Sequence, residues 1–108
     1  MINVPETEYS EEFDKLRKNR IAVSLHKYGS AKINYGERLV SAIGSLKKCL
    51  QKYEETGNTE YLCDLANYAM FEYMYPQHNN AYFEATDSSE SAGIDGMSIK
   101  EIQDKYEM

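Results

Sequence analysis

The chain has 108 residues, 42% of them hydrophobic and 28% charged, which suits one small folded domain rather than a disordered chain. Its formal net charge of -6 argues against direct nucleic-acid binding, because an acidic surface repels the phosphate backbone. No apolar run approaches the roughly 20 residues that cross a bilayer, so no membrane-spanning helix is expected. We therefore expect a cytoplasmic protein whose Cys49 and Cys63 are reduced thiols, with no metal site, because no close Cys/His spacing is present.

The predicted fold class is all-α, with a helical core domain over residues 10–76. Residues 1–9 contain a proline and little pattern, and we interpret them as a flexible lead. Ser10 is a favourable N-cap residue for a first helix. We expect this helix to run to about Tyr28 and to end at Gly29.

Arginines occupy the inner arc of this first helix. Arg17, Arg20 and Ser24 form a polar strip between two apolar edges. Guanidinium groups there need carboxylates, phosphates or solvent as acceptors. The strip is therefore either a surface pair or a contact with a ligand or an acidic partner.

Residues 27–36 are predicted to be a connector between helices. Backbone amides near Gly29, beside Lys27 and Lys32, offer the alternative of an anion site. Tyr28 lies in the same stretch.

The second and third helices are predicted to form an antiparallel hairpin, because Gly57 and the following Asn-Thr leave a very short link. An apolar stripe, widened by Ala42 and Cys49, marks the inner face of the second helix: Leu39, Ile43, Leu46, Leu50 and Tyr53. These three helices make up the predicted core.

The third helix, residues 58–76, carries the most ordered polar pattern. Its predicted buried face consists of Leu62, Leu65, Ala66, Ala69 and Tyr73. The opposite face is predicted to carry Glu60, Asp64, Asn67 and Phe71. Glu60 and Asp64 stand one turn apart, so they indicate either a solvated face or part of a magnesium site.

Beyond Pro76 the composition becomes polar. Residues 77–96 are predicted to form an exposed loop with one helical turn near residues 81–85. Ser98 and Glu101 form a capping box that predicts a short helix over residues 97–108.

The order Lys27-Tyr28-Gly29, connector, helix and then Leu62-x-Asp64-x-Ala-Asn67-Tyr-Ala resembles the all-α nucleotide pyrophosphohydrolase-like group, which includes the MazG-like proteins. The chain also resembles short phage or prophage proteins. The resemblance implies a dimer or higher homo-oligomer, and a magnesium ligand at Asp64 with Glu60 as a looser match. Glutamate pairs expected on the preceding helix are replaced by Ala42 to Ser45.

We expect from this resemblance a non-catalytic phage-type protein that binds a component of host defence in the host cytoplasm, as an anti-CRISPR-like inhibitor does. A nucleotide ligand would contact Arg17, Arg20, Lys27, Tyr28, Asp64 and Asn67. A defence nuclease would instead meet the loop carboxylates Asp87, Glu90 and Asp95. The alternatives are a magnesium-dependent pyrophosphohydrolase using Asp64, Glu60 and Glu37, and a structural or assembly module. No cofactor is expected outside the hydrolase alternative.

Overall fold

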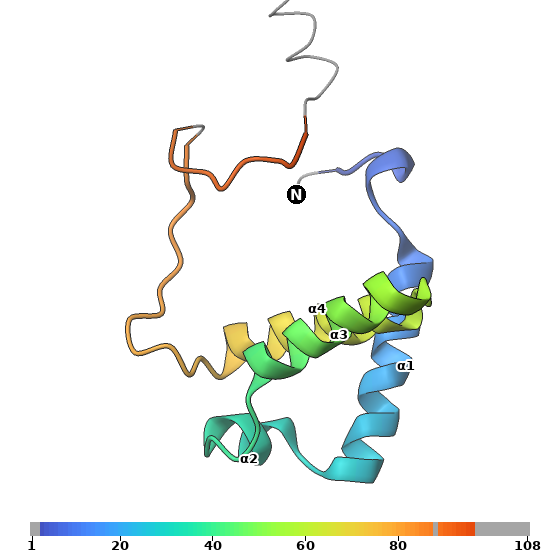
Figure 1. Ribbon diagram of the computed structural model, residues 1–108, viewed down its shortest axis with the longest axis vertical. Coiled ribbons are helices and arrows are strands. Elements are labelled where there is room, and N and C mark those ends of the chain that lie inside the picture. Colours follow the sequence, from blue (N-terminus) through green and yellow to red (C-terminus); the bar gives the residue numbers. More distant parts are fainter. Residues whose placement is uncertain (1–2, 88, 97–108) are drawn as a thin grey trace, which may run out of the picture.

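In the computed structural model, which describes residues 3–87 and 89–96, the chain is all-α (Figure 1). Within these described residues the elements are a 3-10 turn at Glu6–Glu8 and four α-helices: α1 (Glu11–Tyr28), α2 (Ala31–Gly36), α3 (Ala42–Thr56) and α4 (Glu60–Met74). None of the helices in this described part of the chain is both long and apolar enough to cross a bilayer.

The predicted hairpin is present as α3 and α4, which make the most extensive contact in the fold and lie side by side in Figure 1. Gly57 ends α3 with φ 75°, and its N–H donates to the carbonyl of Tyr53. This left-handed residue reverses the chain at once, because glycine adopts positive φ without a Cβ clash. The helix α1 lies crosswise against α4 (Figure 1).

The interpretation of residues 27–36 as a plain connector is wrong, because they contain α2. The Ser30 hydroxyl accepts a hydrogen bond from the Lys32 N–H at 3.1 Å and caps this short helix. A helix of six residues is not stable alone, so its packing against α4 holds it in place. The Tyr35 ring lies stacked on that of Phe71, with centroids 5.0 Å apart.

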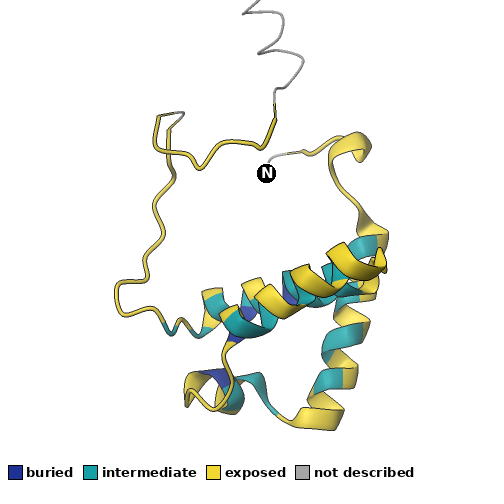
Figure 2. Ribbon diagram, in the orientation of Figure 1, coloured by how far each residue is buried: buried dark blue, intermediate teal, exposed yellow. Residues whose placement is uncertain are grey.

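The predicted division of α4 into one buried and one open face is also wrong. Cys63, Asn67 and Phe71 are its buried residues, whereas Tyr73, assigned to the inner face, is 74% exposed. The difference arises from tertiary packing, because α4 contacts α3 and also α1 and α2. The face of α4 that carries Asn67 and Phe71 is therefore covered as well. Figure 2 shows the buried residues where these helices meet.

Two apolar stripes predicted from periodicity remain largely open in the single chain. In α3, Ala42 is buried, while Ile43 and Leu50 are exposed; Leu39 precedes the helix and is also exposed. The covered side of α3 lies within the predicted stripe, because Leu46, Cys49 and Tyr53 are half-buried beside the buried Ala42. On α1 no residue is fully buried, and its exposed apolar side chains are Leu16, Val23, Leu25 and Tyr28.

The segment after α4 contains no regular element among its described residues 77–87 and 89–96. The helical turn predicted near residues 81–85 is wrong, because that stretch contains no helix and is exposed. Its start is anchored: the Gln77 side chain donates to the carbonyls of Tyr35 and Val40. The helix predicted over 97–108 lies outside the described residues.

Replacing Gly29 with alanine should lower the free energy of unfolding by about 1–3 kcal/mol, because Gly29 has φ 87° and ψ -168°, a region nearly restricted to glycine. No heavy atom lies within 4 Å of the added Cβ position, so the cost is backbone strain and not a clash. Gly36→Ala is the control, since its Cβ would meet only Tyr75 at 3.8 Å. Urea unfolding of both variants tests this, and equal midpoints would contradict it.

Candidate functional site

The arginines of α1 reach the polar residues of α4. Arg20 donates from Nε to Asp64 Oδ1 at 3.0 Å and from Nη2 to Asp64 Oδ2 at 3.1 Å. Its Nη2 also lies 3.6 Å from a carboxylate oxygen of Glu60. The bidentate hydrogen bond to Asp64 is the first cause of a raised pKa of Arg20. The carboxylate pair of α4 is thus engaged by one guanidinium.

Arg17 and Asn67 form the second polar contact between these helices. The Asn67 side chain is buried and donates from Nδ2 to the main-chain carbonyl of Arg17 at 2.8 Å. Arg17 donates from Nε to Asp14 at 2.9 Å and from Nη1 to Asn67 Oδ1 at 3.4 Å. Asn67 therefore fixes where α1 crosses α4, because a buried amide needs partners for both its donor and its acceptor.

Two adjoining pockets between α1 and α4 form what we name the α1–α4 cleft. The larger pocket, of about 520 Å³, extends to α2 and is mostly apolar. The smaller pocket, of about 180 Å³, is more polar than the larger one and has Arg20, Lys27, Asp64 and Asn67 on its walls. The residues common to both pockets are Ile21, Ser24, Tyr28, Tyr68 and Phe71.

Aromatic rings make the wall of the larger pocket. Tyr35 and Phe71 are stacked, and Tyr68 meets both rings edge-on with centroids 6.5 Å away. Burial raises the pKa of Tyr68 and raises that of Tyr35 to about 12, so both phenols stay neutral at physiological pH. A flat apolar body is the kind of group that such a wall accommodates.

Of the six residues predicted to contact a nucleotide, five line the smaller pocket: Arg20, Lys27, Tyr28, Asp64 and Asn67. The sixth, Arg17, lines neither pocket and is occupied by Asp14 and Asn67. The Lys27 ammonium lies 5.0 Å from the centroid of the Tyr28 ring, and both side chains are exposed. Lys27 is therefore the cation most available to an anion entering the cleft.

The remaining predicted residues lie outside the cleft. Glu37 follows α2 and is exposed. In the described part of the chain, no group of three or more His, Cys, Asp or Glu side chains is placed to hold a metal ion. Asp87, Glu90 and Asp95 are all exposed on the segment after α4, where the Asp87 carboxylate accepts from Ser89 and from the Glu90 N–H.

Sequence reasoning missed the aromatic wall. Tyr35 was part of a predicted connector, and Phe71 was placed on an open face. The sequence does show several aromatic residues in α4. Their packing could not be predicted from it, because they form the wall only where α2 packs against α4. Both cysteines are free thiols, with Cys63 buried and Cys49 half-buried.

The raised pKa of Tyr35 predicts a loss of stability at high pH. Between the ordinary pKa of 10 and about 12, the unfolded chain releases the Tyr35 proton while the folded chain retains it. The unfolding free energy should therefore fall as pH rises through this window. Urea unfolding of wild type and Tyr35→Phe tests it: the wild type should lose stability relative to the variant above about pH 10, and parallel curves would contradict this.

Comparison of the chain with protein-family models, with curated proteins and with solved structures finds no match, so the MazG-like resemblance remains a prediction.

Proposed function

We propose that this chain is a non-catalytic binding protein that holds a nucleotide-like ligand in the α1–α4 cleft. The observation that carries the proposal is the continuity of an aromatic pocket with a polar pocket that contains Lys27. A ligand with a flat ring at one end and an anionic group at the other matches both parts. The larger pocket, at about 520 Å³, is within the range of about 300–1,000 Å³ typical of small-molecule sites.

The ion pair supports binding in preference to hydrolysis. Asp64 is the residue that a magnesium-dependent hydrolase would need, and each of its oxygens already accepts a hydrogen bond from Arg20. A metal ion at Asp64 would compete with a guanidinium that is fully charged at any physiological pH. Glu37, the third carboxylate of that alternative, forms no metal-binding group with Asp64 and Glu60 among the described residues.

In the setting that the resemblance implies, a phage-encoded chain in a bacterial host, such a protein would sequester a nucleotide signal of host defence. The proposal includes a homodimer or higher homo-oligomer. Exposed apolar side chains on α1 and α3, such as Leu16 and Leu50, support self-association, because continuous apolar surface tends to be covered.

Native mass spectrometry of the protein purified from a cell extract, followed by denaturing release of any bound molecule, tests the proposal. We expect an oligomer that carries a ligand with the mass of a nucleotide. A second assay incubates the protein with nucleoside triphosphates and Mg²⁺. Pyrophosphate release that is lost in Asp64→Ala would contradict the non-catalytic proposal and establish the hydrolase alternative.

A further inference from the structure

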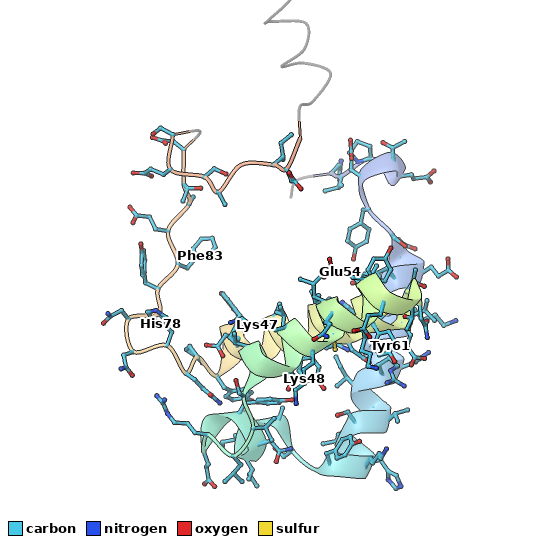
Figure 3. The ribbon with its side chains drawn as sticks, viewed as in Figure 1. Lys47, Lys48, Glu54, Tyr61, His78 and Phe83 are labelled. Carbon is cyan, nitrogen blue, oxygen red and sulfur yellow. The ribbon has the colours of Figure 1, made fainter. Side chains whose placement is uncertain are left out.

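A second pocket, of about 540 Å³, lies where the chain leaves α4, and none of its lining residues lines the α1–α4 cleft. We name it the α4-end pocket. It is formed by the last turn of α4, by Ile43 of α3 and by the segment that begins at Pro76. Figure 3 shows His78 and Phe83 on that segment, beyond the end of the hairpin.

The chemistry of this pocket favours a cation. Aromatic side chains on its walls are Tyr73, Tyr82 and Phe83, which are 74%, 83% and 82% exposed. Ring faces attract ammonium and guanidinium groups through the electrostatic field of the aromatic ring. The described residues that line the pocket include His78 but no Lys or Arg.

A carboxylate with spare acceptor capacity lines the same pocket. Glu72 accepts a hydrogen bond from the Gln77 N–H through Oε2 at 2.9 Å. Its Oε1 is buried and has no hydrogen-bond partner. Buried carboxylate oxygens normally have a donor, and a cationic group held in this pocket would supply the missing one.

The segment that leaves the pocket is acidic, although Arg38 donates from Nη1 to the Gln77 carbonyl at its start, at 3.2 Å. The α4 helix ends with no basic residue in its last turn, so its C-terminal carbonyls retain their partial negative charge. The adjoining residues 77–96 contain no Lys or Arg, but they include Glu84, Asp87, Glu90 and Asp95. This field would attract a basic surface and repel an acidic one.

We propose that the α4-end pocket receives a lysine or arginine side chain from a basic protein partner, with Glu72 as the charged acceptor and the three aromatic rings as the walls. This inference goes beyond the proposed nucleotide site and does not depend on it. It assigns the partner contact to the first part of the polar segment, and the carboxylates further along serve to attract the partner.

Calorimetric titration with a short oligoarginine peptide, capped at both ends, tests the inference. The same peptide with citrulline in place of arginine is the matched probe, because citrulline preserves the shape without the charge. We expect oligoarginine to bind at least about tenfold more tightly than the citrulline peptide. Equal affinities would overturn the inference.

Variants locate the binding within the pocket. Glu72→Gln should reduce oligoarginine affinity about tenfold while keeping the acceptor for Gln77, whereas Glu84→Gln, which does not line the pocket, should change it by less than about twofold. Equal losses in both would mean general acidic attraction and overturn the site. Phe83→Leu gives a second readout, because this exposed ring can be removed without affecting the core; an unchanged affinity would also contradict the inference.

Discussion

Phe71→Ala should lower the free energy of unfolding by about 3–5 kcal/mol, which is a large part of the stability of a small domain. Phe71 is 8% exposed and is the point at which α4 meets the Tyr35 ring of α2. Removing it leaves a void beneath Tyr35 and Tyr68 and takes away the surface that holds the six-residue α2 in place. Chemical unfolding followed by circular dichroism measures the change.

Phe83→Ala is the matched control for this result, because it deletes the same side chain at a position that is 82% exposed. Its unfolding free energy should stay within about 0.5 kcal/mol of the wild type. A small effect of Phe71→Ala, similar to that of the control, would show that the packing of α2 on α4 contributes little to the fold.

Asp64→Asn should increase the affinity of the α1–α4 cleft for an anionic ligand about tenfold, which corresponds to about 1.4 kcal/mol. The substitution keeps the shape and one acceptor oxygen but removes the negative charge that engages Arg20 in the smaller pocket. Arg20 then becomes available to the ligand beside Lys27. A hydrolase that binds magnesium through Asp64 predicts the opposite, because metal-dependent binding would be lost.

Glu60→Gln is the control for the charge effect. Glu60 lies farther from Arg20, at 3.6 Å, is 54% exposed at its side chain and does not line the smaller pocket, so solvent screens it more strongly. We expect a change of less than about threefold. Titration of the wild type and both variants with one nucleoside monophosphate measures the difference, and weaker binding by Asp64→Asn would contradict the proposed role of the ion pair.

The helical hairpin could be predicted because its signals are local. Gly57 suits the left-handed C-cap of α3, and the residues of α3 before it follow a helical period. The short α2 has no comparable local signal, because a possible cap at Ser30 does not by itself predict a helix of six residues. This helix depends on the contact between Tyr35 and Phe71.

Burial was harder to predict because it depends on how many neighbours each helix has. Periodicity assigns one inner face to a helix, but α4 is covered from more than one side, so Asn67 and Phe71 are buried. The need of the α1 arginines for acceptors could be predicted from their chemistry. That Asp64 is the acceptor of Arg20 could not, because it depends on the crossing of α1 over α4.

The central claim, that the α1–α4 cleft binds a ligand with both a flat ring and an anionic group, is tested most directly by parallel calorimetric titrations. The probes are the nucleoside monophosphates, the matching nucleosides without phosphate, and inorganic phosphate. We predict saturable binding of at least one nucleoside monophosphate, at least about tenfold tighter than its nucleoside or phosphate alone, and weakened about tenfold by Lys27→Ala. The claim is contradicted if no monophosphate saturates the protein by about 1 mM, or if Lys27→Ala binds as tightly as the wild type.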